Sequence, residues 1–183
     1  MPNWCNNNIE LAHEDPEVLE RAKAAFLDGS FLNEFIPLPK ELEDTTAPAR
    51  ETNESLMAKY GASDWYSWCI NNWGTKWDIS PYSCEIENGQ LIGTFDTAWG
   101  PPVVAYEKLE EMGFSVRAYY YEPGMGFAGV YDDGFDECYD YSQMSADEVD
   151  EELPEALNEM YGIAENMREW EELNAEEGDN ENE

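Results

Sequence analysis

The chain has 183 residues, of which 42 are acidic and nine are basic, so its formal net charge is −33. A surface this negative repels nucleic acid and anionic membranes and attracts basic proteins and cations, over a Debye length of about 8–10 Å. The 42% hydrophobic and 14% aromatic content nevertheless argues against general disorder, because it supplies enough apolar surface for a core. The length suits one folded domain of about 100–150 residues with an appendage.

The acidic residues are unevenly distributed along the chain. Half of them, 21, lie between Asp132 and Glu183, where Arg168 is the only base, so this part alone carries a charge of −20. Adaptation to high salt would spread the acids evenly and is therefore disfavoured as the explanation. The aromatic residues are concentrated before Tyr141. We therefore expect a folded domain at 1–141, an acidic helical segment at 142–173 and a disordered acidic tail at 174–183.

Signals for secretion, for a membrane or for a metal are missing from the sequence. The first residues lack the basic region and the apolar run of about 7–15 residues of a signal peptide, and no stretch approaches the ~20 apolar residues of a membrane span. His13 is the single histidine and has no metal-ligand spacing around it, so we expect no metal and no cofactor. The chain is expected in the cytoplasm, with free thiols at all its cysteines. These are Cys5, Cys69, Cys84 and Cys138.

The first half of the domain predicts a strand, a helix and further helices. Residues 4–12 alternate as a strand that points Ile9 and Leu11 to one face, and a helix follows that is capped by Asp15-Pro16 and ended by Gly29. Residues 31–39 are expected to form an apolar connection and 41–53 an exposed loop. Helices are expected at 55–60 and 63–72, and the second buries three or four apolar residues. These are Trp65, Trp68, Cys69 and Trp73.

The second half predicts mostly strands. Strands at 82–87 and 90–96 flank Asn88-Gly89, which is a strong signal for a hairpin. A helix that opens at Pro101-Pro102 and ends at Gly113 precedes a meander of strands at 115–122, 127–131 and 135–141. This order predicts an α+β fold, a ferredoxin-like split βαβ sandwich with an antiparallel sheet and helices on one face, plus the acidic C-terminal helical segment.

The acidic segment has its own helical pattern. Ser145 and Glu148 form a capping-box pattern, and Pro154 is expected to break the helix that they start. Apolar residues then recur every three or four positions, at Leu157, Met160, Ala164, Met167 and Trp170. The opposite side is a run of glutamates with almost no lysine, so the helix needs its apolar stripe docked on something.

Three loops combine aromatic residues with glycine or proline, at 72–78, 95–102 and 121–127. They fall at predicted strand ends, where a pocket with aromatic walls and a few polar groups could bind a small ligand. The alternative is that the aromatic residues belong to the core and Lys76 forms a structural ion pair. The candidate pocket residues are Lys76, Trp77, Asp78, Asp96, Trp99, Glu122 and Phe127.

Four short segments carry a resemblance to a known family. They read MPNWCNN at 1–7, NWGTKWD at 72–78, TAWGPP at 97–102 and EPGM at 122–125. Together they resemble the YubB-like ferredoxin-fold family of uncharacterised phage and plasmid proteins, over about residues 1–141. The resemblance implies a ferredoxin-like fold and an origin in a mobile element. It implies no activity and no catalytic residue.

Catalytic motifs are absent from the sequence, which has no Ser-x-x-Lys, no phosphate loop and no His-Glu-x-x-His. We therefore expect a non-enzymatic, acidic interaction protein of a phage or plasmid. The more specific hypothesis is that the protein is a nucleic-acid mimic, which binds and inhibits a basic host protein of defence or regulation. The expected partner-binding residues are Glu148, Glu151, Glu152, Glu155, Glu159, Leu157, Met160 and Trp170.

Other functions remain open. The acidic segment could serve only solubility. The three aromatic loops could make a small-ligand-binding or catalytic domain. Direct binding of nucleic acid through aromatic residues of the sheet is opposed by the charge, because each phosphate contact needs a local cation. The sequence leaves the oligomeric state open.

Overall fold

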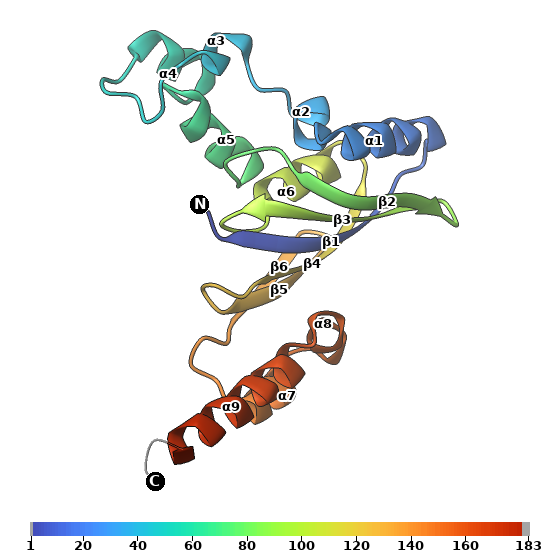
Figure 1. Ribbon diagram of the computed structural model, residues 1–183. Helices are drawn as coiled ribbons and strands as arrows, with labels where there is room; N and C mark the ends of the chain where they lie inside the picture. The colour runs from blue at the N-terminus through green and yellow to red at the C-terminus, as the bar shows by residue number, and fades with distance from the viewer. Residues whose placement is uncertain (1, 181–183) are drawn as a thin grey trace.

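The computed structural model describes residues 2–180, which form an α+β fold around a six-stranded, open antiparallel sheet (Figure 1). The strand order is β2-β3-β1-β4-β5-β6, so the first strand of the chain lies at the centre of the sheet. The strands are β1 (Trp4–Ala12), β2 (Ser80–Glu87), β3 (Gln90–Ala98), β4 (Ser115–Glu122), β5 (Phe127–Asp132) and β6 (Phe135–Asp140).

The helices occupy the segments between the strands and after the last strand. They are α1 (Pro16–Asp28), α2 (Phe31–Phe35), α3 (Lys40–Glu43), α4 (Glu54–Tyr60), α5 (Trp65–Trp73), α6 (Val103–Glu111), α7 (Ala146–Glu152), α8 (Glu155–Tyr161) and α9 (Ile163–Asn180). Most of them start and end where the sequence signals indicate. The Asp15 side chain accepts a hydrogen bond from the Glu17 N–H at the start of α1, and Gly29 ends that helix with a φ of 73°.

Two short helices lie where the sequence predicts irregular structure. Helix α2 falls in the expected connection, and the single turn of α3 falls at the start of the expected loop. The Asp78 carboxylate accepts hydrogen bonds from the N–H groups of Leu32 and Asn33, each at 2.9 Å, at the start of α2. Because this cap lies far away in the chain, the local sequence around α2 does not contain it.

The main core lies between one face of the sheet, here called the first face, and helices α1 and α6. Ile9 and Leu11 of β1 point to this face and are fully buried, as the alternation of strand 4–12 predicts. Phe26 of α1 and Phe95 of β3 meet over them with their rings edge to face, 5.4 Å apart. Helix α1 packs mainly over β2 and β3, and α6 packs over β4, so the two helices lie to either side of the central strand β1.

The turn between β2 and β3 is the hairpin that Asn88-Gly89 predicts. Both residues have positive φ, 50° and 82°, as a two-residue turn with the twist of the flanking strands requires. The register pairs Glu87 with Gln90 directly across the turn. The prediction of this hairpin is confirmed.

The second face of the sheet is covered over β4 and β5 by helices α7, α8 and α9, which in Figure 1 lie on the side away from α1 and α6. Side chains that alternate away from the first face, Tyr119, Tyr121, Ala128 and Val130, form a second apolar cluster with these helices. The expected arrangement of helices on one face is thus correct only for the preceding part of the chain. The C-terminal segment supplies a second helical layer, because the apolar second face needs a cover.

The expected boundary at 141 falls in the connection between β6 and α7, and the expected boundary at 174 falls within the span of helix α9. Tyr141 is buried in the second apolar cluster, and helix α9 continues to Asn180. The last part of the expected tail, residues 181–183, lies outside the described residues. No helix between residues 2 and 180 combines the length and apolarity needed to cross a membrane. All four cysteines lie in the described part of the chain as free thiols, and Cys138 alone among them is exposed.

Gly129 in β5 provides a test of this packing. A Cβ atom there would lie 2.2 Å from the Tyr120 hydroxyl and 2.5 Å from the Glu137 carbonyl oxygen, because the Tyr120 side chain passes over Gly129. We expect Gly129→Ala to lower the free energy of unfolding by about 1–3 kcal/mol, measured by urea denaturation. Gly100→Ala is the matched control, since its Cβ would meet only Phe127 at 4.0 Å. If Gly129→Ala lowered the free energy of unfolding as little as Gly100→Ala does, the close packing of Tyr120 over Gly129 would be contradicted.

Candidate functional site

The first candidate site is the acidic layer, defined as helices α7 to α9 with their connections (residues 146–173). Some of its apolar side chains pack on the sheet, and of these Val149, Leu153, Leu157 and Ile163 are each at most 5% exposed. They pack with Tyr119 and other residues of the second face. The docking partner that the sequence pattern requires is therefore the sheet itself, and the carboxylates lie on the outer side.

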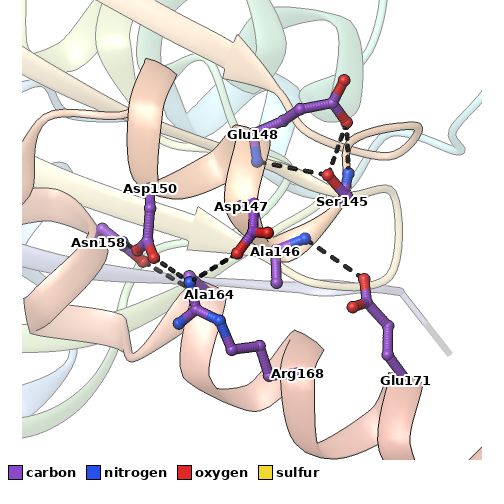
Figure 2. Close-up of polar contacts among 9 residues, drawn as sticks. All are labelled: Ser145, Ala146, Asp147, Glu148, Asp150, Asn158, Ala164, Arg168 and Glu171. Carbon is purple, nitrogen blue, oxygen red and sulfur yellow. Dashed lines mark hydrogen bonds and ion pairs between the residues drawn. The ribbon is translucent and has the colours of Figure 1, made fainter.

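Helix α7 begins with the predicted capping box (Figure 2). The Glu148 N–H donates to the Ser145 hydroxyl oxygen at 3.3 Å, and the Glu148 carboxylate accepts from the Ser145 N–H at 2.7 Å. The Ser145 N–H and hydroxyl both donate to the Glu148 carboxylate, and these two hydrogen bonds lower the pKa of Glu148. The Glu148 carboxylate thus caps the start of its own helix and is less available to a partner than its neighbours.

Gly162 divides the long helix that the apolar spacing predicts. It has a φ of 59°, ends α8 after Tyr161 and redirects the chain into α9. As a result, the apolar residues that recur every three or four positions do not all face the sheet. Leu157 is fully buried, whereas Met160 is 45% exposed and Trp170 is 68% exposed. Of the three apolar residues expected to dock or to contact a partner, Leu157 docks and the other two lie at the surface.

Arg168 neutralises part of the layer from within. Its guanidinium donates to the carboxylate of Asp147 at 3.4 Å and to that of Asp150, and thereby ties α9 to α7 (Figure 2). The hydrogen bond from Arg168 lowers the pKa of Asp150. Exposed pairs of this kind contribute only about 0–1 kcal/mol, so they add little to the buried apolar contact that holds these helices on the sheet.

Asn158 connects all three helices at the same place (Figure 2). Its amide nitrogen donates to Asp150 of α7 at 2.7 Å, and its amide oxygen accepts from the Ala164 N–H of α9 at 2.9 Å. On the far side, the Glu171 carboxylate accepts from the Ala146 N–H at 3.3 Å. Asn158 is an amide within a run of acidic residues, and this feature of the sequence could have indicated that it links the helices.

Tyr161 fastens α8 to the sheet. Its hydroxyl accepts a hydrogen bond from the Asn8 amide of β1 at 2.9 Å and donates one to the Tyr119 carbonyl oxygen of β4 at 2.9 Å. Burial is the main reason why its pKa is raised. Sequence reasoning missed this residue, because the apolar stripe alone was read as the docking element.

Four of the five glutamates that are expected to bind a partner have carboxylates free of the contacts described above. Glu151, Glu152, Glu155 and Glu159 are exposed, and they make no hydrogen bond or ion pair with residues 2–173, whose side chains the structure describes. They lie on α7 and α8, whose positions the sheet and Asn158 fix. The layer can therefore present unpaired negative charges at defined places.

The second candidate site is the aromatic end of the sheet. Here the loop after α5 brings Lys76 and Trp77 beside Trp4 of β1, with the two tryptophan rings 6.2 Å apart. The Lys76 ammonium lies 4.2 Å from the Trp77 ring centroid and 5.9 Å from that of Tyr66. A neighbouring cavity of about 190 Å³ is lined by Ala47, Pro48, Trp65, Tyr66, Lys76 and Trp99.

Only three of the seven residues expected in a pocket thus come together, namely Lys76, Trp77 and Trp99. Asp96 accepts from Asn6 and Tyr82 on the second face of the sheet. The structure places the remaining three, Asp78, Glu122 and Phe127, elsewhere.

Those three residues have structural environments. Asp78 caps α2, and its burial raises the pKa of the carboxyl group. Glu122 is 1% exposed and accepts from the N–H groups of Gly124 and Met125 in the β4–β5 turn. Phe127 packs against the ring of Tyr120. Tyr66 and Trp4, which sequence reasoning did not place at this site, lie in aromatic segments adjacent to the loops that it did name.

Replacing Tyr161 by phenylalanine tests how the acidic layer is attached. The change leaves the Asn8 amide and the Tyr119 carbonyl without their shared partner, so we expect Tyr161→Phe to lower the free energy of unfolding by about 1–3 kcal/mol. Hydrogen exchange should increase most in α8. Tyr82→Phe is the control, because that hydroxyl belongs to a 66%-exposed side chain and its loss should change stability by less than about 0.5 kcal/mol.

The same variant has a pH signature. The pKa of Tyr161 is raised by burial, so its contribution to stability is complete below about pH 10 and is lost as the pH rises further. Tyr161→Phe should therefore lose less stability than the parent chain between about pH 10 and pH 12. If the free energy of unfolding of Tyr161→Phe and of the parent chain fell equally between about pH 10 and pH 12, folding would not hold the Tyr161 hydroxyl in its neutral form.

Comparison with known proteins gives little similarity. No family model matches the chain, and no curated protein matches it. A solved structure, the crystal structure of a protein api92 from Yersinia pseudotuberculosis of family DUF1281, is similar over 77% of this chain and 98% of its own, with 11% sequence identity and a TM-score of 0.42. This similarity is too low to assign a fold or a function.

Proposed function

We propose that the chain is a non-enzymatic protein-binding module that presents the carboxylates of the acidic layer to a basic protein. The observation that carries the proposal is the docking of the layer, whose apolar side is buried on the second face of the sheet. This leaves Glu151, Glu152, Glu155 and Glu159 exposed on helices of fixed position. Ordered charges of one sign favour fast and specific association with a surface of the opposite sign.

The sharper form of the proposal is nucleic-acid mimicry. A groove that binds phosphates through lysine and arginine also accepts carboxylates, and such binding weakens steeply with salt. The segment from Asp132 onward carries a charge of −20, and its single base, Arg168, is engaged with Asp147 and Asp150. In this form the partner is a basic, nucleic-acid-binding protein of a bacterial host, and the chain inhibits it on behalf of a phage or plasmid.

The finer fold assignment is part of the same proposal. The order β2-β3-β1-β4 with α1 after β1 and α6 after β3 supports a ferredoxin-like split βαβ unit, to which β5 and β6 add a hairpin at one edge. Helices α2 to α5 then form an insertion between α1 and β2. The resemblance of four segments to the YubB-like family agrees with this assignment.

Neutralising the four exposed glutamates tests the function without disturbing the core. We expect the combined Glu→Gln variant of Glu151, Glu152, Glu155 and Glu159 to lose at least about tenfold in affinity for its basic partner, because the mutual attraction of charges is removed. Partners are captured from bacterial lysate at low salt and eluted by salt, and double-stranded DNA should compete with capture. Truncation at residue 141 is less suitable, because it would expose the apolar second face.

A matched control separates a local effect from the loss of net charge. Glu→Gln at the exposed Glu20, Glu54, Glu85 and Glu87, which lie outside the acidic layer, changes the net charge equally. This variant should retain binding of the partner. Equal loss in both variants, or no loss in either, would reduce the acidic layer to a solubilising surface and contradict the proposal.

A further inference from the structure

Large aromatic side chains are exposed together at one end of the sheet. Trp4 is 44% exposed, Trp77 is 40% and Trp99 is 52%, although the main core nearby buries Trp68 and Trp73. These three make up almost half of the seven tryptophans of the chain. Grouped exposure of large apolar side chains is typical of a binding site rather than of a general surface.

The cavity beside these rings has one charged group, and that group is positive. Lys76 is the only ionisable side chain with a charge at neutral pH among its lining residues. Of the other eight bases of this acidic chain, Arg21, Lys59, Arg117 and Arg168 are each paired with a carboxylate, and the remaining four form no ion pair within the part whose side chains the structure describes. The Lys76 ammonium lies over aromatic rings, and among the side chains of residues 2–173 no carboxylate oxygen lies within 4.0 Å of it.

The backbone at Trp99 is held in a conformation that a bulky residue rarely adopts. Its φ is 74°, in the left-handed region that favours glycine. The Trp99 N–H donates to the Asn3 carbonyl oxygen at 3.0 Å, and the Thr97 hydroxyl donates to the Gly100 carbonyl oxygen at 2.8 Å. Strain of this kind persists where the surroundings fix it, and it is concentrated at ligand sites.

We propose that this cavity, the Lys76–Trp99 pocket, binds a small planar ligand that carries one anionic group. The flat ring would stack on the aromatic walls, and its carboxylate or phosphate would pair with the Lys76 ammonium. The volume of about 190 Å³ is below the ~300–1,000 Å³ of pockets that bury drug-sized ligands, and it suits a single ring system. The distant acidic residues are screened beyond about 8 Å at physiological salt, so they do not prevent local binding of an anion.

A pair of probes with the same shape tests the charge requirement. Indole-3-carboxylate and the neutral indole-3-carboxamide are titrated into the full chain by calorimetry, with ligand-observed magnetic resonance as a second readout. We expect the carboxylate to bind at least about tenfold more tightly than the amide. Equal binding of the two probes, or no saturable binding of the carboxylate up to about 5 mM, would overturn the proposal.

Two variants then assign the binding to this cavity. Lys76→Met keeps the length of the side chain and removes its charge, so it should abolish the preference for the carboxylate, whereas Lys40→Met on α3 should leave it unchanged. Trp99→Gly suits the positive φ and is expected to fold, and it should weaken both probes by removing the ring. Unchanged binding in Lys76→Met or in Trp99→Gly would place the probe elsewhere and overturn the proposal. Neither result depends on the acidic layer, so the two proposals are tested separately.

Discussion

The burial of apolar residues from α7, α8 and α9 on the second face of the sheet is the interaction on which the rest of the structure depends. Each buried leucine, isoleucine or valine contributes about 1.5–3 kcal/mol, and four of them, Val149, Leu153, Leu157 and Ile163, lie in this contact. A like-charge pair at helical spacing costs only about 0.2–0.5 kcal/mol. Burial therefore outweighs repulsion, and helices that would be unstable in isolation become a fixed surface.

The same sheet separates two kinds of surface. The acidic layer covers β4 and β5 and meets β1 at the Tyr161 hydroxyl, while the second face of β2 and β3 lies outside the second apolar cluster. There Asn6 donates to Asp96 at 3.0 Å and Thr94 donates to the Asn8 amide oxygen at 2.9 Å, in a polar ladder that ends at the Tyr161 hydroxyl. The polar character of these positions limits the helical cover to the apolar half. The aromatic end, with its lysine, lies beyond the end of β1 and is chemically distinct from both.

Much of the fold could be predicted because its signals are local. Strand β1 and the helix caps at Asp15 and Ser145 follow from a few neighbouring residues, and so does the turn at Asn88-Gly89. What could not be predicted depends on residues distant in the chain. The cap of α2 comes from Asp78, and only the folded sheet shows that the aromatic end collects three of the seven expected pocket residues. Gly162 is a local signal for a helix end, but the apolar periodicity runs across it and favours one continuous helix.

Arg168, the one base of the acidic layer, gives the layer an unusual response to ionic strength. Dissolved cations screen the repulsion among its exposed carboxylates, which no lysine relieves, so salt should tighten α7, α8 and α9 against the sheet. The same ions weaken attraction to a basic partner. Folding and recognition thus respond to salt in opposite directions, and a partner released at high ionic strength leaves behind a surface that is better ordered than the one it bound.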